Sequence, residues 1–87
     1  MMLLVGQTTN ITSPIMRHYG GNLTFQADGV FGGATITLYQ SLDNINWILV
    51  ETFTQPTSVT ILGLNSVYFR ASLNGATGTT AVNLYGG

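Results

Sequence analysis

Few side chains in this sequence could carry out chemistry, and those few are scattered. The carboxylates are Asp28, Asp43 and Glu51, whereas a glycosidase must hold two carboxylates across one sugar. His18 is the single histidine, and neither a nucleophile nor a carboxylate lies near it in the sequence. A phosphate loop, a catalytic triad and a metal-binding constellation are also missing from the pattern. The sequence therefore predicts that the chain is not an enzyme.

The polar stretch around Asp43, Asn44 and Asn46 resembles a calcium loop in miniature. Calcium prefers about six to eight oxygen ligands, and these side chains are too few to supply them. Asp and Asn also bond their own backbone in tight turns, so an Asx turn is the interpretation that we favour. With no cysteine and one histidine, a structural zinc site is not expected either. We expect no metal and no cofactor.

The charge content excludes two classes of partner. Only 6% of the residues are charged, against roughly 25% in an average soluble domain. There is no lysine, the two basic residues are Arg17 and Arg70, and the net charge is -1. Nucleic-acid binding needs phosphate-neutralising side chains that this chain lacks. A membrane-spanning helix needs about 20 apolar residues, and the opening MMLLV is too short even for a signal-peptide core.

A surface of Thr, Asn, Ser, Gln and Gly suits a protein whose faces are covered by partners. Interface centres are depleted in Lys, Glu and Asp. A single domain of 87 residues buries only about 60% of its unfolded surface. Without cysteines it cannot add disulfides, so oligomerisation is the expected supplement. The alternative is that Thr and Asn alone keep a free chain soluble.

From Asn22 onward the sequence reads as one strand after another. Apolar and polar residues alternate with period 2, and turn signals recur about every 8–12 residues. We predict an all-β fold, a small antiparallel β-sandwich or barrel of about six to eight strands. The six clearest strands are 22–28, 34–41, 45–52, 58–64, 67–73 and 80–86.

Residues 1–21 lack a sustained period. We predict an extended N-terminal arm over 1–21, with short strands at Leu3–Gln7 and Asn10–Ser13, and a β-sandwich domain over 22–87. An apolar arm of this kind packs on a neighbouring chain. The alternative is that this segment is an ordinary edge strand of the same domain.

Trp47 is the only tryptophan, and it lies in phase with Ile45 and Leu49. A tryptophan buries about 150–250 Å², so we predict a core anchor rather than an exposed binding platform. Ile48 and Val50 lie on the opposite face, which predicts a strand that is central or covered by another chain. The predicted core is Leu23, Phe25, Ile36, Leu38, Ile45, Trp47, Leu49, Val59, Ile61, Phe69, Ala71, Val82 and Leu84.

Two segments carry a resemblance to a known group of proteins. A strand that ends in Ser-x-Asp-x-x-x-Trp is followed by a strand of the form Tyr-Phe-Arg-Ala, a Gly/Thr turn and a closing strand. This order resembles small β-sandwich virion proteins of tailed bacteriophages, which include capsid decoration (cement) and head-tail accessory proteins. The resemblance covers about residues 33–87, and the matching residues are Ser41, Asp43, Trp47, Tyr68, Phe69, Arg70 and Ala71.

The resemblance implies a non-enzymatic virion protein at the capsid surface. Such a protein would form a homotrimer or homodimer and would stabilise neighbouring subunits of the major capsid protein. The residues that we predict at these interfaces are the apolar arm, the second face of the Trp47 strand and two tyrosines. They are Met2, Leu3, Leu4, Val5, Tyr39, Ile48, Val50 and Tyr85.

The alternative function is a carbohydrate- or receptor-binding module of a phage tail or fibre. It predicts a flat platform of exposed aromatic rings, made by Trp47 or by a pair among Tyr39, Tyr68 and Tyr85. It also predicts loops rich in Asn and Asp at one end of the sandwich.

Overall fold

The computed structural model describes the backbone of residues 1–87 and every side chain except that of Leu64. Nine strands and no helix are found over this range. The strands are β1 (Met2–Gln7), β2 (Ile11–Thr12), β3 (Met16–His18), β4 (Gly21–Val30), β5 (Thr35–Ser41), β6 (Ile48–Phe53), β7 (Thr57–Leu64), β8 (Val67–Asn74) and β9 (Ala81–Gly86).

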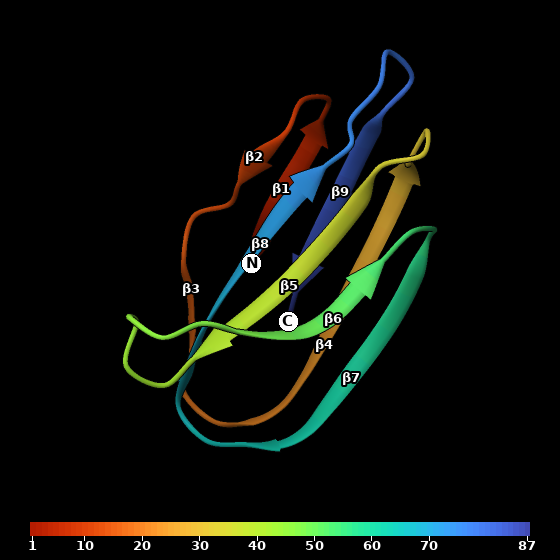
Figure 1. The fold of residues 1–87 in the computed structure, drawn as a ribbon. Coiled ribbons are helices and arrows are strands. Elements are labelled where there is room, and N and C mark those ends of the chain that lie inside the picture. The colour runs from red at the N-terminus through yellow and green to blue at the C-terminus, as the bar shows by residue number, and fades with distance from the viewer.

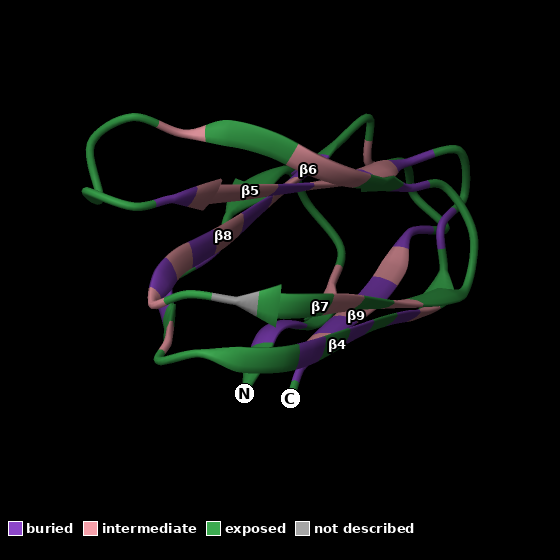
Figure 2. Cartoon of the chain, turned by 90° about the horizontal axis from the view of Figure 1, so that it is seen from below, coloured by how far each residue is buried: buried purple, intermediate pink, exposed green. Residues whose placement is uncertain are grey.

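The strands form two antiparallel sheets that pack face to face. The four-stranded sheet has the order β1-β9-β4-β7, and the five-stranded sheet has the order β2-β8-β5-β6, with β3 also paired to β8. Figure 1 shows how the chain passes between the sheets, and Figure 2 shows them as two layers. The predicted all-β sandwich is therefore confirmed.

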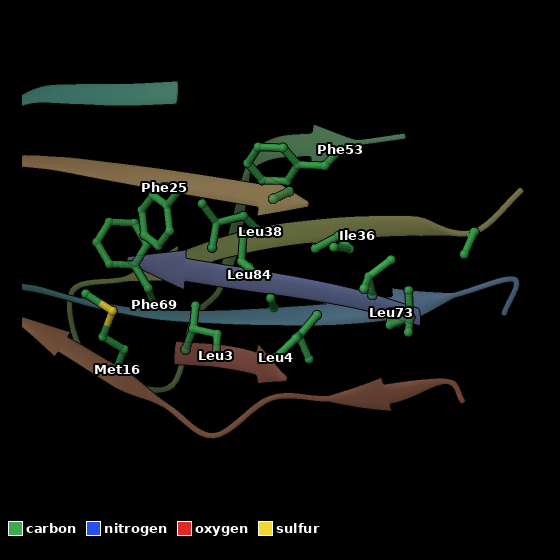
Figure 3. Packing of buried hydrophobic residues seen from close by; sticks show 14 of the residues in the cluster. Leu3, Leu4, Met16, Phe25, Ile36, Leu38, Phe53, Phe69, Leu73 and Leu84 are labelled. Carbon is green, nitrogen blue, oxygen red and sulfur yellow. The ribbon is translucent and has the colours of Figure 1, made fainter. Parts of the chain in front are cut away.

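The core lies between the layers and follows from the period-2 pattern. Along β8, buried residues alternate with half-buried ones from Val67 to Leu73. Phe69 of β8 meets Phe25 of β4 edge to face, with ring centroids 5.0 Å apart (Figure 3). Such aromatic pairs add about 0.5–1.5 kcal/mol to the burial of the rings. This contact joins the centres of the two sheets.

Most of the predicted core is buried. Val59 and Ile61 are only partly buried against the core, because β7 is the terminal strand of its sheet. The predicted residues that are fully buried are Leu23, Phe25, Ile36, Leu38, Phe69, Ala71, Val82 and Leu84. The core also holds Leu3, Leu4, Met16, Ala27, Phe31, Ala34, Phe53, Val67 and Leu73, which the predicted core did not include.

The predicted core positions of Ile45, Trp47 and Leu49 are wrong. Ile45 and Leu49 are exposed and Trp47 is half-buried, since β6 begins only at Ile48. The register also shifts between Leu38, which pairs with Glu51, and Tyr39, which pairs with Leu49. This β-bulge adds one residue to β6 between Leu49 and Glu51, so the side chains before it lie on the opposite face from the one that unbroken alternation predicts. Leu49 therefore points away from the core.

Residues 1–21 belong to both sheets of the sandwich. β1 pairs with β9, while β2 and β3 pair with β8. Leu3 and Leu4 are both buried in the core (Figure 3). Residues 1–21 therefore form strands of the same domain and not an extended arm that leaves it.

Candidate functional site

The side of the sandwich bounded by β6 and β7 carries the candidate site. These are the terminal strands of the two sheets, and residues 54–56 connect them. Figures 1 and 2 show both strands on one side of the molecule. The segment that leads into β6 is a loop, residues 42–47, after β5. This segment decides which side chains the site presents.

Asp43 builds the loop. Its Oδ1 accepts hydrogen bonds from the Ile45 backbone N–H at 2.9 Å and the Asn46 backbone N–H at 2.8 Å. Ser41 Oγ also donates to Oδ1 at 2.9 Å, and Asn46 Nδ2 donates to Oδ2 at 2.7 Å. Asn44 takes the left-handed conformation at φ 61°, which Asn tolerates better than most residues. The predicted Asx turn is therefore confirmed.

The same bonds fix the charge of Asp43. The backbone N–H of Asn46, then that of Ile45, then the side chains of Asn46 and Ser41 hold the pKa of the carboxyl well below its usual range. The group stays ionised, and its oxygens are already used by the turn. Among the described residues, no three His, Cys, Asp or Glu side chains gather where they would hold a metal ion. These hydrogen bonds give Asp43 a structural role in the turn.

The loop and β6 together display four large apolar side chains, which we name the hairpin patch. Each is between 55% and 78% exposed. Isolated apolar residues are normal on a protein surface, but apolar patches mark interaction sites. The hairpin patch consists of Leu42, Ile45, Ile48 and Leu49.

A hollow lies beside Leu42 and Ile48 of the hairpin patch. Its volume is about 220 Å³, and Leu42 and Ile48 contribute the apolar part of its lining. Gln40, Ser41, Asp43 and Asn46 complete the lining. The hollow therefore combines an apolar surface with polar groups, as binding pockets do.

Trp47 has a different role from the one predicted. Its ring lies against Arg70, whose Cζ is 4.3 Å from the ring centroid. Arg70 belongs to β8, and β5 lies between β8 and β6 in the sheet. The indole thus extends across the outer face of the sheet, and its cation–π contact with Arg70 fixes the loop against the sheet.

The other arginine makes a similar cluster on that outer face. The Cζ of Arg17 lies 4.6 Å from the ring centroid of Tyr68 and 5.2 Å from that of Tyr19. Its guanidinium donates to the hydroxyl of Tyr68 and, at 2.9 Å, to Oγ of Ser66. Both arginines of the chain therefore lie over aromatic rings of their own domain.

The structure separates the predicted interface residues into three groups. Ile48 is exposed and Val50 is half-buried on β6, and half-buried Tyr39 lies on the neighbouring strand. Exposed Met2 pairs with half-buried Tyr85 in the other sheet. The third group is Leu3, Leu4 and Val5 of β1.

Residues of the apolar arm differ in exposure. Val5 is exposed on β1. Leu3 and Leu4 are buried in this domain's own core, so they cannot contact a partner while the domain is folded. Of the predicted interface, Ile48 of β6 lies next to exposed Leu49 and follows the loop that carries exposed Leu42 and Ile45.

Sequence reasoning missed most of the hairpin patch. The alternation predicts core positions for Ile45 and Leu49, and Leu42 falls between two predicted strands, in a polar turn. The available signal was the presence of apolar residues between the Asx-turn residues, where a turn needs only polar ones.

Comparison with protein-family models, with curated proteins and with solved structures finds no match to this chain. None of the three therefore identifies it as a bacteriophage virion protein, and that assignment stays a prediction. No helix in the described part of the chain is long and apolar enough to span a membrane.

Proposed function

We propose that the chain is a non-enzymatic structural protein that binds a larger protein assembly through the hairpin patch. Following the resemblance in the sequence, the assembly is a virion, and the chain is a capsid decoration protein. Its partner is then the major capsid protein, and its location is the capsid surface. The observation that carries the proposal is the exposure of Leu42, Ile45, Ile48 and Leu49 within one short segment of a chain with almost no charge.

The energetics of burial support this role. Complete burial of a Leu or Ile side chain stabilises by about 1.5–3 kcal/mol relative to exposure. The four side chains already protrude by more than half of their area, so a partner surface can remove much of it from water. The hollow beside Ile48 can take one apolar side chain of the partner. A chain that binds only the assembled shell stabilises that shell by mass action.

Density-gradient sedimentation tests the proposal. Particles from the culture that naturally produces the chain are purified, and the gradient fractions are probed for the chain. We expect the chain in the particle fractions, and added tagged chain to bind particles that have been stripped of it. A chain found only at the top of the gradient would contradict the proposal.

Two variants make the test specific to the hairpin patch. Ile48→Asn keeps the fold, because Ile48 is exposed, and it should weaken particle binding about tenfold through loss of apolar burial. Val30→Thr removes a comparable exposed apolar side chain from β4, far along the chain from the patch. Its binding should be unchanged.

A second candidate function is the binding of carbohydrate on the outer face of the five-stranded sheet. It is favoured by the half-exposed rings of Trp47, Tyr39 and Tyr68, which lie outside the core as that alternative predicts. Against it, Arg70 lies over the ring of Trp47, and Arg17 lies over that of Tyr68, so faces that would stack on a sugar are occupied.

Tryptophan fluorescence decides between the two functions. If the outer face binds sugar, a panel of neutral and acidic oligosaccharides will shift the emission of Trp47 and protect it from acrylamide. Under the assembly proposal the emission does not respond to any of them.

A further inference from the structure

We infer that two copies of this chain pair through β7, edge to edge and antiparallel, around a two-fold axis at Thr60. The two four-stranded sheets then become one sheet of eight strands. The inference is independent of the proposed function, because it concerns the purified chain alone. It also selects the homodimer from the two oligomeric states expected from the sequence.

β7 is an edge strand with little protection over residues 57–61, since its register shift against β4 lies beyond Ile61. Natural proteins protect edge strands with bulges, charges, prolines or very short strands. β1 has two register shifts along its pairing with β9. β2 and β3 are two and three residues long, and Pro14 separates them. β6 has a bulge and carries Glu51.

Over residues 57–61, β7 is regular and uncharged by comparison. It spans eight residues, Thr57–Leu64. Five consecutive residues from Thr57 to Ile61 pair with β4 without a break. The sequence has no charged residue between Glu51 and Arg70, and Pro56 precedes the strand. The free edge therefore offers a regular row of backbone donors and acceptors.

The sequence of β7 is complementary to itself in one register. With Thr60 on the two-fold axis, Val59 lies opposite Ile61 of the second copy, and Ile61 lies opposite Val59. Both side chains face the core side and are only partly buried in one copy, so the pairing completes their burial. β-branched apolar pairs of this kind favour sheet pairing, and interfaces with two-fold symmetry require such self-complementarity.

The charge pattern favours a second copy as the occupant. Two identical charged edges would repel each other, and like charges directly opposite are unfavourable. Here both edges are neutral. On the outer face, Thr60 already bonds Oγ1 to Oγ1 with Thr24 of β4 at 2.9 Å, so the threonine pairing would continue to Thr60 of the second copy.

Lysine substitutions at two paired positions of neighbouring strands test the inference. In the dimer, Thr60 faces its own copy, so Thr60→Lys places two ammonium groups on neighbouring strands. Thr24→Lys is the matched control, because it loses the same Thr–Thr bond and adds the same charge one strand inward. Across three strand spacings of about 4.8 Å each, the two control charges lie beyond the Debye length of about 8 Å.

Sedimentation velocity over a concentration series gives the readout. We expect the wild type and Thr24→Lys to dimerise alike, and Thr60→Lys to raise the dimer dissociation constant at least about tenfold. A wild type that stays monomeric at every concentration would overturn the inference. So would a dimer that Thr60→Lys leaves unchanged, since another surface would then hold it.

Cysteine cross-linking tests the register and does not depend on the lysine variants folding. The chain has no cysteine of its own. Paired residues on antiparallel strands lie about 4.5–5.5 Å apart between Cα atoms, which a disulfide spans. Thr60→Cys should therefore form a covalent dimer under mild oxidation, and Thr24→Cys should not. Equal cross-linking of the two variants would overturn the pairing at Thr60.

Discussion

Trp47 shows how one residue can connect a loop to a sheet from outside the core. Its ring meets Arg70 at 4.3 Å and is only half-buried. Trp47→Ala should therefore cost about 1–2 kcal/mol of unfolding free energy, the sum of a cation–π contact and partial burial. Phe69→Ala, in the core, should cost about 3–5 kcal/mol. Urea unfolding of both variants measures the difference.

The contribution of the Arg70 contact is separable. A double-mutant cycle of Trp47→Ala with Arg70→Ala should give a coupling energy of about 0.5–1 kcal/mol. A coupling of zero would mean that the two side chains are adjacent but not energetically linked.

The lowered pKa of Asp43 makes the stability of the fold depend on pH in acid. Because hydrogen bonds lower the pKa of Asp43 in the folded chain below its ordinary value of 3.8, the unfolded chain binds this proton first as the pH falls. The stability that the carboxylate contributes is therefore complete above about pH 4 and is lost as the pH decreases further.

Asp43→Asn isolates this effect. Asparagine keeps an Oδ1 acceptor for the Ile45 and Asn46 amides but carries no titrating proton. The melting temperature of the variant should therefore fall less between about pH 6 and about pH 2 than that of the wild type. The remaining carboxylates are the same in both chains and cancel in the comparison. Thermal melts that decrease in parallel would contradict the prediction.

At the scale of the element, β1 is the strand whose role changes most from expectation. Leu4 is 3% exposed in the core, whereas its neighbour Val5 is 64% exposed. Leu4→Ala should cost about 2–5 kcal/mol, a large fraction of the stability of a domain this small. Val5→Ala should change stability by less than about 0.5 kcal/mol.

The comparison of these two variants distinguishes a structural strand from a free arm. If residues 1–21 were an arm that packs on other chains, Leu4→Ala and Val5→Ala would both unfold at the same urea concentration as the wild type. Chemical denaturation of the purified chain is sufficient to tell.

The six predicted strands correspond to observed ones because apolar and polar residues alternate along each of them over several positions. Leu23, Phe25 and Ala27 of β4 follow period 2 without interruption, so the sequence alone assigns their face. Where a bulge occurs, this rule fails. By this rule Leu49 would face the core, but the register shift beside Tyr39 places its side chain on the outer face.

Backbone irregularity also hid β1 and the candidate site. Leu3 and Leu4 are adjacent and both buried, which an alternating strand does not allow, and β1 achieves it through a register shift between Met2 and Leu4. The hairpin patch was likewise hidden because the Asx turn of Asp43 delays the start of β6. Periodicity carries no information about either feature.

At the scale of the whole molecule, the two proposed contact surfaces lie toward the same side of the sandwich. The hairpin patch occupies the β5–β6 segment, and the free edge of β7 ends the other sheet. The scarcity of charge suits both surfaces. β7 carries no charged residue, and the carboxylate of Asp43 beside the hollow is already hydrogen-bonded within its own turn, so covering either surface desolvates little charge. In this account, one side of a small domain holds both the contact with a second copy and the contact with the assembly.

The most direct test of the central claim is hydroxyl-radical footprinting of the chain, free and within the particles from its natural source. We predict that oxidation of Leu42, Ile45, Ile48 and Leu49 falls several-fold in the particles, while that of exposed Val30 stays unchanged. Equal oxidation of the hairpin patch in both states would contradict the claim that this surface binds the assembly.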